Sequence, residues 1–389
     1  QSMLSDYFPA RNRAGVLGVY LASIHLGSAA ALILGGLFLK NWGSWCSAFP
    51  DGACGLTNWR AAFLTVGLPG LVLAILVFFL REPPRPQAHV SRPAMAIIKQ
   101  EMSAAIPPFT VLTLARHGGK KAALANVGLM ALLALGCGAI AAQTGDWAQW
   151  IAVAIGTYSV ATWSQILKHG DAPLYRLTFG CPTFMLAMFG GALLACFVGT
   201  IATWAMPYAM RTLHADAGKV GLALGAAQFG SAVTSVILGG LIADWWKRRD
   251  ARGPIWIGMI ALLVPVPLLF VLLKATTLGG FVAAYAALTL FSMSWAGPFA
   301  AVAQDLVLVR MRGAASAIFS LVMILVAAGI GPYWVGKIST LSGSLTTGLY
   351  SLLAFVPAAA ILLVLAARRL QDETPEGRQA RARAAGEQI

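Results

Sequence analysis

The sequence has little charge for its length. Of its 389 residues, 11% are charged and only 14 are acidic, whereas roughly a quarter of the residues in a soluble globular protein are charged. Hydrophobic residues make up 58% of the chain, and the mean hydropathy is +0.75. This composition excludes an ordinary soluble domain and predicts a polytopic membrane protein.

Histidine and cysteine are also scarce. The five histidines, at positions 25, 89, 117, 169 and 214, fit no metal-ligand spacing. We find no nucleophile paired with a base and no cofactor motif, so we expect neither an enzyme, nor a metal site, nor a cofactor. Of the five cysteines, Cys46 and Cys54 share one loop and could form a disulfide if that face is oxidising. The other three lie in apolar segments and are interpreted as packing residues.

Long apolar runs are what the chain does contain. A helix of about 20 apolar residues crosses a bilayer roughly 30 Å thick. Ten such runs are predicted to be membrane helices, giving an all-α fold: 14–39, 61–80, 122–142, 146–167, 181–207, 218–243, 254–273, 279–303, 314–335 and 345–367. The third and fourth runs are the weakest. Both cross or neither does, because losing one would invert every later helix; we favour both.

The net charge of +14 is explained by topology. It could indicate a nucleic acid or an acidic partner. With ten crossings and a cytoplasmic N-terminus, however, only six of the 28 basic residues lie outside and the other 22 lie inside: the outer six are Lys40, Arg60, Arg211, Lys219, Lys274 and Lys337. This agrees with the positive-inside rule. We therefore expect no nucleic-acid partner, and we expect both termini in the cytoplasm.

Changes in composition divide the chain into four parts. We predict two helices in 1–81, a proline-rich connector carrying the inserted helix pair in 82–177, a six-helix bundle in 178–371, and a polar cytoplasmic tail in 372–389. Residues 94–105 could form a short helix on the membrane surface, but a solvated connector is the favoured interpretation. The tail is expected to fray.

One motif ends an apolar, glycine-rich helix in a single acid and a basic cluster. It reads Gly240-x-x-x-Asp244, followed by Lys247, Arg248 and Arg249. A carboxylate near hydrocarbon is costly unless it holds something in place, so the motif indicates a gate. Three further patterns accompany it: Gly18-x8-Gly27-x3-Ala31-Leu32-x2-Gly35-Gly36; Ser5–Pro9 with Arg13, Asn58–Phe63 and Arg81–Pro83; and Trp204–Tyr208 with Arg211, Gly331-Pro332 and Gly336.

Together these patterns resemble the major facilitator superfamily, most closely its Spinster-like and sugar-phosphate-permease-like branches. The resemblance implies a secondary transporter in which two helix bundles alternate access to a solute held between them. It aligns the chain from the family's helix 5 onward, so helices 1–4 are expected to be absent and helices 5–12 present, with an inserted pair between the halves. Ala31 and Leu32 stand where the family often has Gly and Pro, which weakens any antiporter inference.

The resemblance also implies a role for the acidic motif. In the family, this acid caps the cytoplasmic start of helix 5 when the inner gate is shut. Here that start is flanked by Arg11 and Arg13. The gating candidates are therefore Asp244, Lys247, Arg248, Arg249, Arg11 and Arg13.

Polar residues at mid-depth are the candidates for contact with a solute. His25 and Gln228 lie near the middle of their runs, where a cavity role and a helix-to-helix hydrogen bond are both open. Trp204, Tyr208 and Arg211 lie toward the outside, where anchoring at the interface explains them about as well as solute binding does. Trp295 and Tyr333 are interpreted as packing residues, as are Trp334, Ser292 and Ser294.

The favoured function is alternating-access transport of a small organic or amphipathic solute; the resemblance suggests an anionic or lysolipid-like one. The alternatives are a broad-specificity drug or metabolite efflux pump and, in another class, a transporter-derived sensor or an inactive fragment. Proton coupling stays open, because no acid lies at mid-depth in this chain. We expect a monomer in a bacterial inner membrane.

Overall fold

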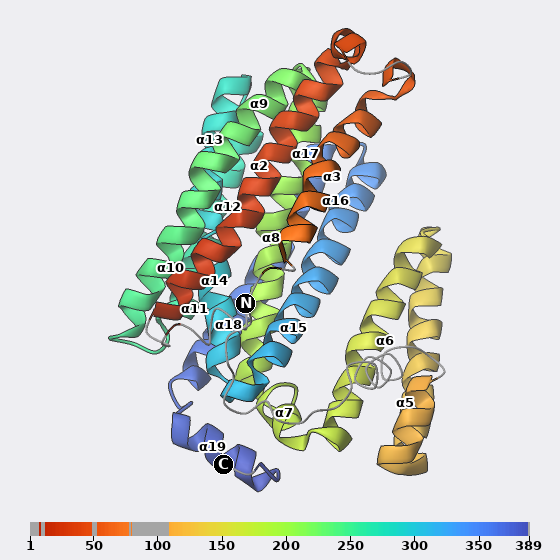
Figure 1. Cartoon of the computed structure of the whole chain (residues 1–389), viewed down its shortest axis with the longest axis vertical. Helices are drawn as coiled ribbons and strands as arrows, with labels where there is room; N and C mark the ends of the chain where they lie inside the picture. The colour runs from red at the N-terminus through yellow and green to blue at the C-terminus, as the bar shows by residue number, and fades with distance from the viewer. Residues whose placement is uncertain (1–7, 9–11, 49–52, 78, 80–108, 388–389) are drawn as a thin grey trace.

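The computed structural model describes residues 8, 12–48, 53–77, 79 and 109–387, and every regular element among them is helical (Figure 1). The first part of the described chain comprises α2 (Arg13–Trp45), the short turns η2 (Cys46–Ala48) and η3 (Ala53–Gly55), α3 (Asn58–Val77), α5 (Phe109–Thr144), α6 (Trp147–Gly170) and α7 (Ala172–Leu177). The predicted surface segment 94–105 lies outside the described residues.

The later helices form a bundle in which several membrane helices are built from more than one segment. They are α8 (Pro182–Thr212), α9 (Ala217–Ala227), η4 (Gln228–Ala232), α10 (Val233–Lys247), α11 (Gly253–Leu263), α12 (Pro265–Leu273), α13 (Leu278–Ser292), α14 (Ala296–Asp305), η5 (Val309–Met311), α15 (Arg312–Met323), η6 (Ile324–Ala328), α16 (Gly329–Ser342), α17 (Leu345–Tyr350), η7 (Ser351–Ala354), α18 (Phe355–Leu370) and α19 (Pro375–Ala384). Both η4 and η6 are π-helical turns inside longer helices.

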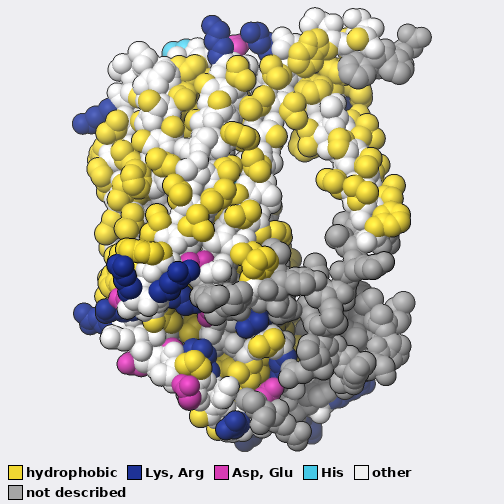
Figure 2. Space-filling view, turned by 60° about the vertical axis from the view of Figure 1, so that its left-hand side comes forward, with side chains coloured by type: hydrophobic (Ala, Val, Ile, Leu, Met, Phe, Trp, Pro, Cys, Tyr) yellow, Lys and Arg dark blue, Asp and Glu magenta, His cyan; other side chains and the backbone are white. Residues whose placement is uncertain are grey.

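Within the described ranges, nine helices are long and apolar enough to cross a membrane. They match nine of the ten predicted runs, and the tenth, α6, is a 24-residue helix outside that set. Apolar side chains cover the middle of the face shown in Figure 2, and Lys and Arg side chains gather toward its two ends. This is the surface expected of an integral membrane protein.

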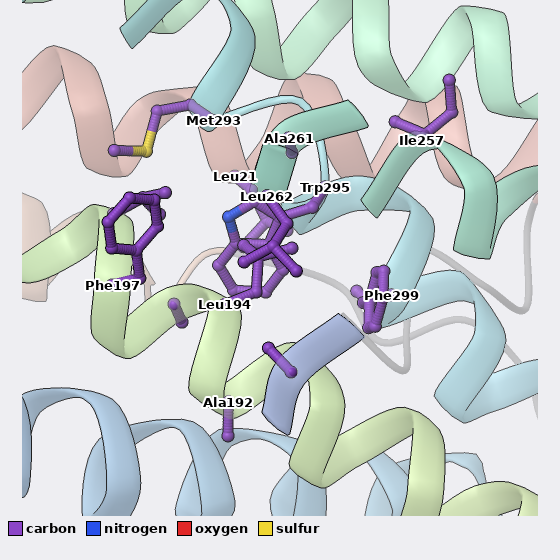
Figure 3. Close-up of a cluster of buried hydrophobic side chains, with 14 of the residues drawn as sticks. Leu21, Ala192, Leu194, Phe197, Ile257, Ala261, Leu262, Met293, Trp295 and Phe299 are labelled. Atoms are coloured by element: carbon purple, nitrogen blue, oxygen red, sulfur yellow. The ribbon is translucent and has the colours of Figure 1, made fainter. Parts of the chain in front are cut away.

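The core lies around α8, which is buried along most of its length. Phe184 and Phe197 on this helix are fully buried, and residues of α8 pack with Leu262 of α11 and Phe299 of α14 (Figure 3). Helix α8 contacts α18, α16 and α11, so these three helices pack around it. By contrast, α3 exposes most of its apolar residues and joins α2 near the Cys46–Cys54 disulfide.

The inserted helices α5 and α6 form an antiparallel hairpin beside the bundle (Figure 1). Helix α5 begins at Phe109, before the predicted run 122–142, and it kinks at Gly119, where φ is 73°. Buried polar groups link the two helices: Asn126 Nδ2 donates to Thr162 Oγ1 at 2.8 Å, and Tyr158 Oη donates to Asn126 Oδ1 at 2.7 Å. Such pairing is needed where no water reaches polar groups.

The expectation of a frayed tail is wrong. Residues 375–384 form α19, and its Ala382 is fully buried. Thr374 caps the helix by accepting from the Gly377 N–H at 3.1 Å, and Glu373 forms an ion pair with Arg381. Hydrogen bonding and charge pairing within a polar segment therefore supply the order that its composition did not predict.

Candidate functional site

A cavity of about 850 Å³ lies between α2 and the later bundle. Its wall is mostly apolar, with contributions from α2, α8, α13, α16 and the two π-helical turns. The polar lining residues are few: His25, Ser28, Thr203, Gln228 and Tyr285, with the Trp295 indole beside them. Among the described residues that line the cavity, none is Asp, Glu, Lys or Arg.

Three of these polar side chains form a hydrogen-bonded chain that links three helices. The Tyr285 hydroxyl donates to Gln228 Oε1 at 2.6 Å, and Gln228 Nε2 lies 3.5 Å from His25 Nδ1. Gln228 is only 4% exposed and begins the π-helical turn η4. A π turn displaces a helix from its regular path, and such turns are frequent at functional sites. The chain thus joins α2 to the later bundle at the cavity wall.

Trp295 adds an unsatisfied donor to the wall. Its side chain is 9% exposed, and in the described part of the chain its indole Nε1–H has no hydrogen-bond partner. The ring is held edge-on to Phe299, with centroids 5.9 Å apart (Figure 3). A buried donor without a partner is costly, and this N–H is itself shielded from the cavity, so a solute acceptor could bond it only after a local shift of the wall. The sequence analysis interpreted Trp295 as a packing residue and did not predict this unpartnered donor. The Gly297-Pro298 pair that follows Trp295 is a sequence signal of a helix break.

The three candidates Trp204, Tyr208 and Arg211 are not among the residues that line the cavity. Trp204 Nε1 donates to the Pro332 carbonyl at 3.3 Å. Tyr208 is 2% exposed, and its hydroxyl donates to the Leu273 carbonyl at 2.9 Å. Arg211 is exposed in the last turn of α8. Backbone carbonyls of other helices therefore engage the two aromatic residues, and neither they nor Arg211 belong to the cavity lining.

At the N-terminal end of α2, one carboxylate caps the helix. Asp244 Oδ2 accepts from the Gly15 N–H at 2.7 Å, and Oδ1 accepts from the Ala14 N–H at 3.2 Å. These amides belong to the first turn of α2, which has no intrahelical acceptor for them. Asp244 is 5% exposed. Gly240 permits the approach, because a Cβ there would lie 2.5 Å from the Ala14 carbonyl oxygen.

The cations after Asp244 have separate partners. Lys247 forms an ion pair with Asp305 at the end of α14. Arg248 Nη2 donates to the Asn12 side-chain oxygen at 3.3 Å, just before α2. The Arg249 guanidinium lies over the Trp245 ring, 4.4 Å from its centroid. Arg11 and the side chain of Arg13 lie outside the described residues.

Near its C-terminal end, α2 packs on α9 through glycines. A Cβ on Gly221 of α9 would lie 2.6 Å from the Leu32 carbonyl oxygen and 3.0 Å from Gly36 Cα. The side chain of Lys40 covers Gly218, where an added Cβ would lie 2.8 Å from Lys40 Cδ. Small residues at a crossing let two backbones approach closely. The cavity therefore lies between two tight contacts of α2.

Comparison with known proteins agrees with this arrangement. The family model of the Major Facilitator Superfamily matches residues 1–332. An "MFS-type efflux pump" of Mycolicibacterium smegmatis is 32% identical over 192 residues, which are 49% of this chain and 42% of that protein. The chain thus spans less than half the length of this relative.

Two solved structures of a bacterial homologue of the human lysosomal transporter Spinster share the fold. The inward-facing, unoccupied form has a TM-score of 0.59 at 18% identity, covering 96% of this chain and 75% of that one. The inward-facing, occupied form has a TM-score of 0.54 at 17% identity, covering 94% and 72%.

Proposed function

The chain belongs to the major facilitator superfamily, and from this we propose that it carries the solute cavity and the inner gate of a secondary transporter. The observation that carries the proposal is the 850 Å³ cavity between α2 and the later bundle, with the His25–Gln228–Tyr285 chain on its wall. Transporters of this kind bind solute near the bilayer midplane and expose it to each side in turn. The protein would lie in a bacterial inner membrane with both termini cytoplasmic.

The cavity wall favours a neutral amphipathic organic solute over an anionic one. Its surface is mainly apolar and includes Met206 and Met293, whose flexible side chains adapt to different shapes. An anion would find a cation in the described lining only if His25 were protonated. The unpartnered Trp295 N–H suits a solute that has a hydrogen-bond acceptor.

The second candidate function is an efflux pump for drugs or metabolites, and export is the direction of transport that we favour. The relative from M. smegmatis bears the name of an efflux pump and is 32% identical over 192 residues. An adaptable, mostly apolar cavity is consistent with several solutes of one chemical class. His25 is the titratable group that would couple such transport to protons.

Asp244 acts as the inner gate in this proposal. A carboxylate at a helix N-terminus contributes about 0.3–1 kcal/mol when exposed and up to about 2 kcal/mol when partly buried. A contribution of this size favours the closed state of the inner side over the open state but leaves both states populated. The contact of Asp244 with Ala14 and Gly15 thus supports closure at the inner side and still allows opening.

Transport by the full-length protein in liposomes tests the proposal. Neutral, cationic and anionic amphipaths would be compared with and without a pH gradient, using wild type, Trp295→Phe and the control Trp59→Phe, an exposed tryptophan on α3 outside the cavity lining. We expect the neutral series to be transported, and we expect only Trp295→Phe to raise KM, by about three- to tenfold, the size of one hydrogen bond. Absence of transport for all three series, or equal effects of the two variants, would contradict it.

A further inference from the structure

The tip of the inserted hairpin contacts one face of α16 at three positions spaced four residues apart. Gln149 Nε2 donates to the Gly329 carbonyl at 2.6 Å. The Tyr333 hydroxyl donates to Asp146 Oδ2 at 2.9 Å. Asp146 also forms an ion pair with Lys337 at 2.7 Å.

Further contacts surround these three. The Lys337 ammonium donates to the Thr144 carbonyl at 2.6 Å, and the Trp150 ring lies edge-on to Tyr333 with centroids 5.8 Å apart. Residues separated by four positions lie on one side of a helix. The hairpin therefore holds a continuous stripe of α16.

The same stretch of helix forms part of the cavity wall. Ala327 and Ala328 of η6 and Pro332 of α16 line the cavity. A π turn and an internal proline both interrupt the regular hydrogen-bond ladder of a helix, and here they lie within a few residues of each other. Because the backbone hydrogen bonds of this segment are irregular, contacts from a neighbouring helix can determine its conformation.

From these contacts we infer that the α5–α6 hairpin braces the cavity wall, with Asp146 and Gln149 as positioning residues for η6 and α16. The inference rests on the proposed function, because it gives the hairpin a part in shaping the solute cavity. Neither residue lines the cavity itself. They act through Gly329, Tyr333 and Lys337.

The hairpin is stiff enough to serve as a brace. Besides Asn126 and Thr162, its inner network includes Gln165, whose Oε1 accepts from Asn126 Nδ2 at 2.9 Å. Its base is fixed to the later bundle, where Trp163 lies edge-on to Phe179 with centroids 6.2 Å apart. The brace is thus anchored at its base and holds α16 at its tip.

A cysteine placed in the wall reports on the brace without any need for transport. In the full-length protein, Cys137, Cys181 and Cys196 would be replaced by Ala, the Cys46–Cys54 disulfide kept, and Ala328→Cys introduced. Thiol labelling of this cysteine would be compared between Gln149→Leu and Gln143→Leu. Gln143 is an exposed residue beside Thr144, and in the described part of the chain its side chain makes none of these contacts, so it is a matched control.

We expect Gln149→Leu to change the labelling rate by about three- to tenfold, the size of one lost hydrogen bond, and to raise KM for solute with little change in kcat. We expect Gln143→Leu to change neither. Equal labelling in both variants, each with the Tm of the parent, would overturn the inference. Absence of transport in wild type would defeat the proposed function instead, and the labelling comparison would still decide the brace.

A charge exchange gives a second test that does not rely on Gln149. Asp146→Lys and Lys337→Asp are each expected to shift the Ala328→Cys labelling rate, and the double variant is expected to return it toward the parent rate. Rescue supports a specific contact across the hairpin and α16. Two single shifts without rescue, or no shift in either single variant, would overturn the brace.

Discussion

Glycine contacts hold both ends of α2 against the later bundle, but only one end adds a carboxylate. At the N-terminal end, which the proposed topology makes the inner contact, Asp244 accepts from two backbone N–H groups, and Gly240 lets the backbones approach. At the C-terminal end, the outer contact of that topology, glycines let the backbones of α2 and α9 touch, and the side chain of Lys40 covers one of them. Added bulk would break either contact, whereas neutralising a carboxylate weakens only the inner one.

Bulk at the outer contact should have the largest effect. In Gly221→Leu the new Cβ would meet the Leu32 carbonyl and Gly36 Cα, and backbone cannot move aside cheaply. Overpacking costs about 1–3 kcal/mol, occasionally more. We expect loss of transport and a lower Tm, measured by liposome flux and thermal unfolding. Gly279→Leu, at a position with open space around its Cβ, should keep both; equal losses would contradict the steric explanation.

Removing the charge of the inner contact should have the next largest effect. Asp244→Asn keeps the shape of the side chain but weakens its acceptance from Ala14 and Gly15, so the inner side should open more often. A change of about 1–2 kcal/mol corresponds to a shift of roughly five- to thirtyfold. Thiol labelling of cysteines on the two faces measures it. The control is Asp250→Asn, whose acid pairs with Arg252 in the following turn; unchanged labelling in Asp244→Asn would contradict the gate.

Acidification should weaken the ion pairs that Glu373 and Asp171 form. Burial opposes ionisation of Glu373, but hydrogen bonds and charge from Arg381 outweigh it and lower the pKa of this carboxyl. Burial likewise opposes ionisation of Asp171, and hydrogen bonds from Arg310 and the Leu174 N–H lower its pKa. Since both folded pKa values lie below the unfolded ones, the stabilisation is present above the unfolded pKa and is lost as pH falls through the folded pKa.

Hydrogen exchange across α19 measures this loss. Below about pH 4, near the ordinary pKa of Asp and Glu, exchange in α19 should rise progressively while exchange in α13, which is capped by the neutral Thr277, stays slow. In Glu373→Gln the α19 helix should be loosened already at neutral pH and respond less to acid. A parallel rise in α13 would mean that the whole bundle, and not the tail contact, is titrating.

Loss of the Arg249 contact should have the smallest effect. Its guanidinium stacks on Trp245 at the exposed end of α10, and cation–π pairs at exposed sites contribute about 0.5–1 kcal/mol. Arg249→Ala should therefore shift inner-face labelling less than Asp244→Asn does. A larger shift would place the gate in the basic cluster and not in the carboxylate cap.

The resemblance predicted the contact between the acidic motif and the start of α2, but the sequence did not predict the whole cavity. The acidic motif and the start of α2 were predicted to meet, and the structure places Asp244 on Ala14 and Gly15. Tyr285 and Trp295 were not singled out for the cavity, although both line it, Tyr285 bonds Gln228, and the buried Trp295 N–H has no partner in the described part of the chain. Membrane helices are apolar on most faces, so periodicity does not show which face turns inward.

The sequence by itself determined the all-α membrane fold and the helix order, because apolar length and the placement of cations depend only on local composition. It also marked the acid of the inner contact. Only the tertiary structure decided that Tyr208 bonds the Leu273 carbonyl, that the tail folds as α19, and that the hairpin tip holds α16. Each of these depends on the rotation of a helix and on a partner distant in sequence, which long-range packing alone sets.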